Sequence, residues 1–438
     1  MNAKDLLTPK TWFVRGAEQA TVLAVRPLHW LMAVPSLVFL ATLGVMLFRP
    51  PNIEFYSLDR FALAILIFAA LLRALLMRQT LMISAAVTLP LLCLLALGFT
   101  RVIQQPYDAS NWSVFAAKWA VPFILFLLAG LVFEDQGSLH RFETFALATL
   151  AYLILIAVAF AVDARSLIFP RFILDESIGI HADRARGPFL QAVANGVSIL
   201  LLGLIALNSY RRRRLRGILA LAFLLSFPVA VAATKTRAVW LSSIAALIVL
   251  LVFCHDSRMR RACHAMVLIL LIGTLCAVMF SIYDSSFGER FRDASPVDYR
   301  VAMYDAGWQM FLEKPLFGWG PNQIQPELAS RISDFHVETF ILHNTYLEIA
   351  VEHGLVGLVL YIWLLTDLFR IGKVRALSAP RGVFPDSQFR SLWPLMILVF
   401  IINAFFVVMN YQFVSGLLFT VAGILAAQNR HLELERLR

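Results

Sequence analysis

Residues 217–233 read GILALAFLLSFPVAVAA, and residues 265–280 read AMVLILLIGTLCAVMF. Neither stretch contains a charged residue, and apolar side chains would cover every side of the helix that each forms. The helix of a soluble protein carries apolar residues along one stripe only, whereas a helix that crosses a bilayer core of about 30 Å needs roughly 20 predominantly apolar residues. The two stretches therefore predict membrane-spanning helices.

The rest of the chain has the same character. Of its 438 residues, 60% are hydrophobic and only 15% are charged, where a soluble domain has about 25% charged residues. We predict an all-α polytopic membrane protein with a single transmembrane domain, residues 1–438, and about 12 transmembrane helices. The predicted spans lie near 28–48, 61–77, 80–99, 113–133, 143–163, 189–208, 217–234, 237–254, 265–282, 346–369, 391–409 and 413–428.

The net charge of +10 allows nucleic-acid binding, but the distribution of the basic residues argues against it. They cluster in short connections, such as 209–216 (SYRRRRLR), 255–264 and 370–390. The cytoplasmic loops of membrane proteins carry an excess of Lys and Arg. With twelve spans these connections fall on one side together with both termini, so we predict that this side is cytoplasmic and that nucleic acid is not a partner.

The opposite side receives one long loop, residues 283–345, between the ninth and tenth spans. It holds more Asp and Glu than Lys and Arg. Its residues 298–313 (DYRVAMYDAGWQMFLE) have apolar side chains at helical spacing and predict an amphipathic helix, on the membrane surface or over a cavity. Pro315 should end that helix, and FGWGPN at 317–322 predicts a turn.

Four of the cations in the other connections of this side are candidate site residues, because topology does not favour positive charge there. Lys235 and Arg237 occupy the short turn between two spans, and Arg184 and Arg186 precede the sixth span. A guanidinium binds phosphate oxygens in a bidentate way, so these residues are candidate contacts for a diphosphate. The alternatives are binding of lipid phosphates at the interface and, for the two arginines, a pair with Asp183.

Further candidates lie within the long loop and at its end. Arg300 is predicted at the start of the loop helix, where a cation is unfavourable against the helix dipole. His343 and Asn344 come directly before the tenth span, and a histidine there can accept a proton near neutral pH. Glu348 is about one turn inside the membrane and needs a hydrogen-bond donor. A structural role, in a salt bridge or a hydrogen bond, is the alternative for each.

Several sites can be set aside from the sequence. No metal-binding spacing such as HExxH occurs, and the chain has neither a nucleotide phosphate-binding loop nor a GxSxG elbow. We therefore expect no metal, no cofactor and no nucleotide, which disfavours ATP-driven transport and transfer from a nucleotide sugar.

Three motifs carry a resemblance to a known family. They are PLFGWGPN at 315–322, HNTYLE at 343–348 and GLVGL at 354–358. Together with Thr236-Arg237 at a short turn and a large loop between the ninth and tenth of twelve spans, they resemble the O-antigen ligase and polymerase superfamily. The motifs separate the members of that superfamily poorly.

The resemblance implies a GT-C-like membrane fold in the bacterial inner membrane, with the site in the periplasm. It implies an O-antigen ligase, which moves a glycan from undecaprenyl diphosphate onto lipid A-core in lipopolysaccharide biosynthesis, with inversion and without a metal. The catalytic residues would be His343, Arg300 and Arg237, with Arg186 as a further phosphate contact. Arg184, Lys235, Asn344 and Glu348 would contact substrate, and membrane lipids would surround the protein.

Other functions remain open. An O-antigen polymerase uses the same donor with a second lipid-linked glycan as acceptor. A protein O-oligosaccharyltransferase of the same superfamily transfers to protein. A transporter or flippase for a lipid-linked glycan would use the same arginines for binding and would need no base, but it usually shows ionisable groups deep within spans or paired repeats with broken helices.

Overall fold

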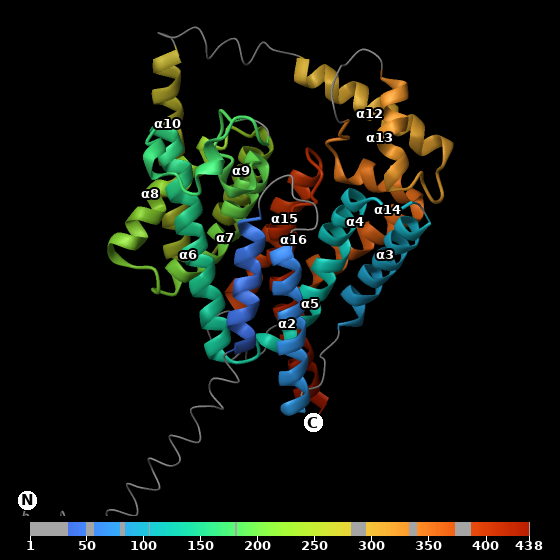
Figure 1. Cartoon of the computed structure of the whole chain (residues 1–438). Helices are drawn as coiled ribbons and strands as arrows, with labels where there is room; N and C mark the ends of the chain where they lie inside the picture. Colours follow the sequence, from blue (N-terminus) through green and yellow to red (C-terminus); the bar gives the residue numbers. More distant parts are fainter. Residues whose placement is uncertain are drawn as a thin grey trace, which may run out of the picture.

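A computed structural model describes residues 34–49, 57–78, 84–104, 106–179, 182–281, 295–332, 340–372 and 387–437. These residues form helices joined by turns, and no β-strand occurs among them. Figure 1 shows the long helices side by side in a bundle, with α12 and α13 above one side of it. The longer helices are Val34–Leu47, α2 (Ser57–Leu76), α3 (Ala85–Ile103), α6 (Gln136–Ala161), α7 (Ala192–Arg211), α8 (Gly217–Ala233), α9 (Arg237–Phe253), α10 (Ser257–Ser281), α12 (Ser295–Glu313), α13 (Pro321–Arg331), α14 (Thr345–Ile371), α15 (Ser387–Ala404) and α16 (Gln412–Leu437).

One further long helix is composite. It runs over Ala109–Val132 and consists of α4 (Ala109–Phe115), a π-helical turn η1 (Ala116–Ala120) and α5 (Val121–Val132). Short 3-10 turns, η2 (Arg165–Leu167), η3 (Arg171–Leu174) and η4 (Gly187–Phe189), lie between α6 and α7.

Several helices are suited to cross a membrane, which confirms the predicted membrane class. Within the described residues, six are long and apolar enough by length and composition: Ala85–Ile103, Ala109–Val132, Gln136–Ala161, Ala192–Arg211, Thr345–Ile371 and Gln412–Arg430. Shorter apolar helices are Val34–Leu47, Gly217–Ala233, Arg237–Phe253 and Phe389–Ala404. Each predicted span overlaps a helix of the structure, while the count of twelve stays a prediction.

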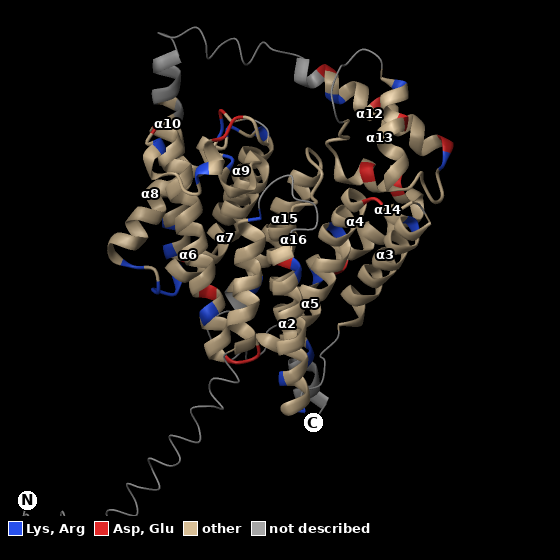
Figure 2. Ribbon diagram, viewed as in Figure 1, with Lys and Arg blue, Asp and Glu red and all other residues tan. Residues whose placement is uncertain are grey.

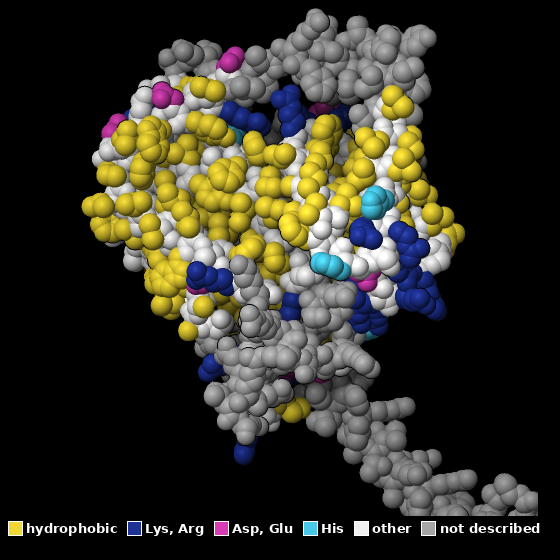
Figure 3. Space-filling model, turned by 180° about the vertical axis from the view of Figure 1, so that it is seen from behind, with side chains coloured by type: hydrophobic (Ala, Val, Ile, Leu, Met, Phe, Trp, Pro, Cys, Tyr) yellow, Lys and Arg dark blue, Asp and Glu magenta, His cyan; other side chains and the backbone are white. Residues whose placement is uncertain are grey.

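The molecule has two distinct ends (Figures 1 and 2). The end of α16 and the basic connection between α7 and α8 lie at the lower end, and α12, α13 and the connection between α6 and α7 lie at the upper end, which we call the α12 end. From behind, hydrophobic side chains form a broad belt between the two ends (Figure 3). The exposed apolar residues Ile218, Leu219, Leu271 and Leu275 are of the kind that faces acyl chains.

The described part of the long loop contains more helix than predicted. α12 confirms the amphipathic helix and ends at Glu313, before Pro315, as expected. It begins at Ser295, however, so Arg300 lies in its second turn and the dipole argument made for that residue was wrong. A second helix, α13, follows the turn and was not predicted. The two helices pack on α14 through buried Met303, Met310 and Leu328, among others.

The most consequential feature of the fold is a break in α14. A regular helix would bond the N–H groups of residues 355 and 356 to the carbonyls of residues 351 and 352. In this structure those carbonyls accept hydrogen bonds from the N–H groups of Trp319, at 2.8 Å, and Gly320, at 3.0 Å. The freed N–H groups of residues 355 and 356 donate to the carbonyls of Pro315, at 2.7 Å, and Leu316, at 3.3 Å.

We call residues 315–320 the strap, because they bind both sides of this break. Every backbone group that the break releases at these four positions thus finds a partner, which is required within a membrane. The strap is held from outside as well. The Arg101 guanidinium of α3 donates to the Phe317 carbonyl at 2.7 Å, and the Trp319 indole donates to the Met310 carbonyl of α12 at 2.7 Å.

Two glycines make this contact possible. Gly354 has φ 68° and ψ −162°, a conformation that is essentially restricted to glycine. A Cβ added there would lie 2.3 Å from the Leu316 backbone. Gly318 has φ 69°, and its Cβ would lie 2.4 Å from the Val351 carbonyl oxygen. The motifs around 315–322 and 354–358 are therefore two halves of one contact.

We expect Gly354→Ala to destabilise the protein by roughly 1–3 kcal/mol from backbone strain alone, with a further loss because the strap must move. The measurement is thermal unfolding of the purified protein in detergent. Gly44→Ala is the matched control, because an added Cβ at this helical glycine meets nothing within 4 Å. Equal unfolding temperatures for the two variants would contradict the role assigned to the break.

Candidate functional site

The predicted site residues lie in two groups at the α12 end. The first group is formed by the segment before α7 and by the turn between α8 and α9. The Ala185 N–H donates to the Ala233 carbonyl at 3.1 Å, and Lys235 Nζ donates to the Asp183 carbonyl at 3.0 Å. Arg184 lies 3.8 Å from the Asp183 carboxylate. The structure thus brings two segments about 50 residues apart into direct contact.

Arg237 is the first residue of α9, directly after this turn. The helix begins here because Thr236 is extended, with φ −114° and ψ 113°. The Arg237 side chain is exposed and makes no ion pair with any residue that the structure describes. An exposed guanidinium in this position is available to an anionic ligand.

Arg186 belongs to the same segment but has a different environment. Its side chain is 1% exposed. The guanidinium donates to the carbonyls of Ile173, at 3.0 Å, Ile178, at 2.6 Å, and Asp175. Burial lowers the pKa of this guanidinium, although an arginine stays charged in proteins. In this conformation Arg186 fixes the connection between α6 and α7, and contact with a phosphate would require it to leave these carbonyls.

The second group lies where the long loop enters α14. Asn344 caps the helix, since its Oδ1 accepts from the N–H groups of Tyr346, at 2.9 Å, and Leu347, at 3.1 Å. His343 precedes it with φ 51°, a conformation that is uncommon for residues other than glycine. Its side chain is half-buried, and its ring lies edge-on to the Tyr299 ring, with centroids 6.0 Å apart.

Arg300 is next to Tyr299 on α12, so His343 and Arg300 belong to neighbouring elements. The Tyr304 hydroxyl donates to the His343 carbonyl at 3.2 Å, which ties α12 to the start of α14. Burial raises the pKa of the Tyr304 hydroxyl, so the hydroxyl remains a donor at neutral pH. Arg300 itself is exposed.

The end of α15 connects the two groups. α15 packs against α9, and the Asn403 amide donates to Ser242 of α9 at 2.9 Å. The Tyr346 ring of α14 is tilted against the ring of Phe405, the residue after α15, with centroids 4.5 Å apart. Arg237 and His343 therefore lie at the same end of the molecule, on helices that both pack on α15.

Glu348 has the donor that its predicted depth requires, and the sequence did not identify it. Lys118 Nζ of η1 lies 2.6 Å from Glu348 Oε1 and 2.6 Å from Glu352 Oε2. His353 Nε2 is 3.2 Å from the other oxygen of Glu352. The signal for this cluster was present, because an ionisable residue inside an apolar span calls for a partner, and Lys118 is such a residue.

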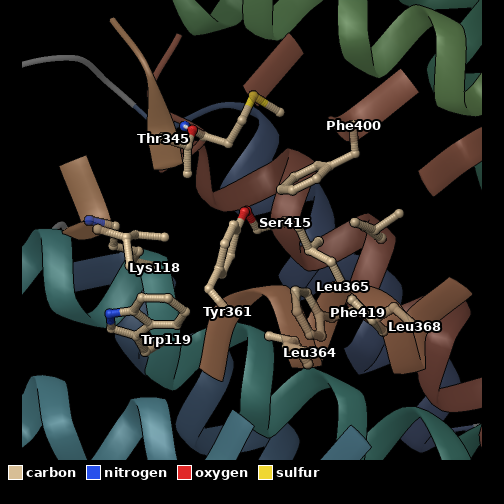
Figure 4. A pocket seen from close by; sticks show the side chains of 13 residues that line it. Lys118, Trp119, Thr345, Tyr361, Leu364, Leu365, Leu368, Phe400, Ser415 and Phe419 are labelled. Atoms are coloured by element: carbon tan, nitrogen blue, oxygen red, sulfur yellow. Dashed lines mark hydrogen bonds between the residues drawn. The ribbon is translucent and has the colours of Figure 1, made fainter. Parts of the chain in front are cut away.

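Lys118 and Trp119 also line a small internal pocket between η1, α14, α15 and α16. Figure 4 shows these two side chains at one edge, with Tyr361 beside them and Phe400 opposite. Thr345 and Ser415 add polar atoms to walls that are otherwise apolar. Among the described residues, no three His, Cys, Asp or Glu side chains are grouped so as to hold a metal ion.

A comparison with known families bears on this arrangement. The family model described as O-antigen ligase matches residues 221–362, from within α8 to the second half of α14. The match includes the turn at Arg237, the helix with Arg300, the strap, His343 and the break. This match supports membership of the chain in the O-antigen ligase and polymerase superfamily. No curated protein matches the chain. The match agrees with the predicted family and supports an O-antigen ligase- or polymerase-type function in lipopolysaccharide biosynthesis.

The environment of Arg186 yields a prediction. Arg186→Gln removes donors to buried carbonyls, so we expect faster amide hydrogen exchange over residues 164–179 and a loss of about 1–3 kcal/mol of stability per carbonyl left unpaired. Hydrogen exchange read by mass spectrometry measures the first effect. Arg184→Gln is the control, because its side chain is partly exposed. Unchanged exchange in Arg186→Gln would show that this side chain does not hold the connection between α6 and α7 in place.

Proposed function

We propose that this protein is an O-antigen ligase: a metal-independent, inverting glycosyltransferase with a GT-C-like fold. It would transfer O-antigen polysaccharide from undecaprenyl diphosphate to lipid A-core at the periplasmic face of the bacterial inner membrane, with both termini in the cytoplasm. The observation that carries the proposal is the position of exposed arginines and a half-buried histidine, on α9, on α12 and directly before α14, at the end opposite the basic connections.

The arginines suit the leaving group. As the glycosidic bond breaks, the diphosphate gains negative charge, and cations held in place beforehand stabilise that charge most effectively. Arg237 and Arg300 are exposed, and Lys235 lies beside Arg237 in the same turn. Arg184 is the further phosphate contact of this group, whereas Arg186 would take part only after rearrangement.

His343 suits the acceptor. In the proposed step the imidazole takes the proton of an acceptor hydroxyl, and the hydroxyl oxygen forms a bond to the anomeric carbon. The bond from that carbon to the diphosphate oxygen breaks on the opposite face, so the configuration inverts and undecaprenyl diphosphate leaves with the electron pair. Tyr304 holds the carbonyl of His343, and Asn344 caps the helix that follows it.

The fold suits substrates that are anchored in lipid. Donor and acceptor would both approach from the bilayer. The helices α12 and α13 lie above one side of the bundle, at the end where the two substrates would meet. Trp308 and Leu312 of α12 are exposed, and an apolar face of this kind favours contact with membrane lipid. A cover that limits water also limits hydrolysis of the donor.

Replacing the proposed base tests the chemistry. We expect His343→Ala to lower transfer of glycan from purified undecaprenyl diphosphate donor to lipid A-core by about 10²–10⁴-fold, with thermal unfolding unchanged. His264→Ala is the control, since this exposed histidine belongs to α10, away from the site. A folded His343→Ala protein with wild-type transfer would rule out His343 as the base and leave glycan transfer to be explained by another group.

Replacing the proposed phosphate contacts tests the electrostatics. We expect Arg237→Gln and Arg300→Gln each to lower the transfer rate by about 10²–10³-fold, because the charge that develops on the diphosphate loses a cation. Arg260→Gln removes an exposed arginine of α10 and serves as the control. If all three variants transfer glycan equally well, the arginines do not stabilise the leaving group.

A further inference from the structure

The helix that carries Lys118 is irregular where Lys118 lies. Residues 116–120 form a π-helical turn within the otherwise α-helical stretch Ala109–Val132. Such turns are rare and occur frequently at functional sites. Three consecutive residues of the turn, Ala117, Lys118 and Trp119, are buried. The turn thus places a lysine against α14, with its side chain only 4% exposed.

The facing part of α14 is irregular as well. Because the helix is broken at Gly354, residues 345–353 form a short helical piece of about two and a half turns. Isolated helices shorter than about 12–15 residues are marginal in water, so the position of this piece depends on its contacts. His343 and Asn344 lie at its beginning, and the strap binds the carbonyls at its end.

Lys118 binds the side of this short piece. Glu348 and Glu352 are four residues apart, so they lie one above the other on one helix face, and Lys118 Nζ is 2.6 Å from an oxygen of each. His353 is 0% exposed and contacts the remaining oxygen of Glu352 at 3.2 Å. The Trp119 ring lies 6.3 Å from the His353 ring. Two neighbouring residues of the π-turn therefore contact the piece just before its break.

The other contacts hold its two ends. At the first, Thr345 Oγ1 donates to the Val407 carbonyl at 2.8 Å and accepts from the Met409 N–H at 3.0 Å. At the second, the strap binds residues 351 and 352. These hydrogen bonds hold the ends of the piece, and buried Ile349 and Val351 pack against its neighbours. The ion pairs of Lys118 hold the face that carries Glu348 and Glu352 and further oppose rotation about the helix axis. A rotation at this place would turn His343, which precedes the first residue of the helix.

We infer that Lys118 is a positioning residue: through its ion pairs with Glu348 and Glu352 it fixes the rotation of residues 345–353 and thereby the direction in which His343 faces the substrate. This inference rests on the proposed function for its consequence in catalysis, but the fixed rotation of the helix does not depend on it. Lys118 is buried beneath the site and touches no reacting atom.

The decisive variant removes the charges and keeps the shapes. Lys118→Met alone leaves two buried carboxylates without their cation, and such a protein can fail to fold. The triple variant Lys118→Met, Glu348→Gln, Glu352→Gln is uncharged at all three positions and nearly isosteric. We expect it to unfold near the wild-type temperature and to lose kcat on the order of 10²-fold, the cost of a small misplacement of a catalytic group.

Lys118→Arg is the conservative variant. With both glutamates kept, this variant retains a cation between the two carboxylates, and we expect a kcat much closer to the wild-type value than that of the triple variant. The matched control is the double variant Asp367→Asn, Arg370→Gln, which removes an ion pair of 3.1 Å from the other end of the same helix. We expect it to transfer glycan at the wild-type rate. A triple variant with wild-type kcat, or a control that loses as much kcat, would overturn the inference.

A second measurement is independent of catalysis. Hydrogen exchange over residues 340–353 should accelerate in the triple variant, whereas exchange in the control should be unchanged there. If wild-type protein transfers no glycan while this difference in exchange is present, the proposed function fails and the positioning role of Lys118 stands. If exchange over these residues is the same in wild type and triple variant, the positioning role fails whatever the activity.

Discussion

The structure depends on the hydrogen bonds between the strap and the break in α14. A helix inside a membrane cannot leave backbone groups unpaired, and this helix is interrupted at residues 352–354. Two hydrogen bonds of a regular helix are absent at the break. Four backbone hydrogen bonds between α14 and the strap replace them, two on each side of the break. The α12–α13 unit is thereby joined to the bundle by main-chain contacts at the depth of the break, and its position follows that of α14.

The same contact divides α14 into a longer part after the break and a shorter part next to the candidate site. The helix as a whole packs against α3, α15 and α16. The shorter part has His343 before its first residue and is held at its ends by hydrogen bonds and on its side by Lys118. A catalytic group at the start of a short, separately held helix can be placed by few contacts, and an imidazole in the proposed role needs such placement.

Much of the fold could be predicted from the sequence because apolar stretches of membrane length are a strong and local signal. The span predicted near 217–234 corresponds to α8, residues 217–233, and the periodic pattern at 298–313 predicted most of α12. The strap could not be recognised as one side of a helix break, because FGWGPN has the composition of an ordinary turn and its partners lie more than 30 residues further along. The α13 helix was missed since two prolines and few apolar residues obscure its pattern.

The site was predictable to a similar extent. The positions of Arg237 and His343 followed from topology and from the family motifs. The burial of Arg186 did not, because nothing local shows that an arginine before a Gly-Pro pair will bind three carbonyls. Glu348 was seen to need a donor, but Lys118 lies 230 residues away in the sequence. Pairing over such a distance is decided by how helices pack, and that packing is not visible in either segment alone.

The central claim is that this protein transfers a glycan from a lipid diphosphate to lipid A-core. The most direct measurement is a reconstituted reaction with purified protein, a labelled undecaprenyl-diphosphate-linked glycan, and both lipid A-core and a second lipid-linked glycan offered as acceptors. The account predicts label on lipid A-core, a β-linked product from an α-linked donor or the reverse, and release of undecaprenyl diphosphate. Label only on the second lipid-linked glycan would make the protein a polymerase, and movement of donor across the vesicle membrane without any transfer would contradict the account.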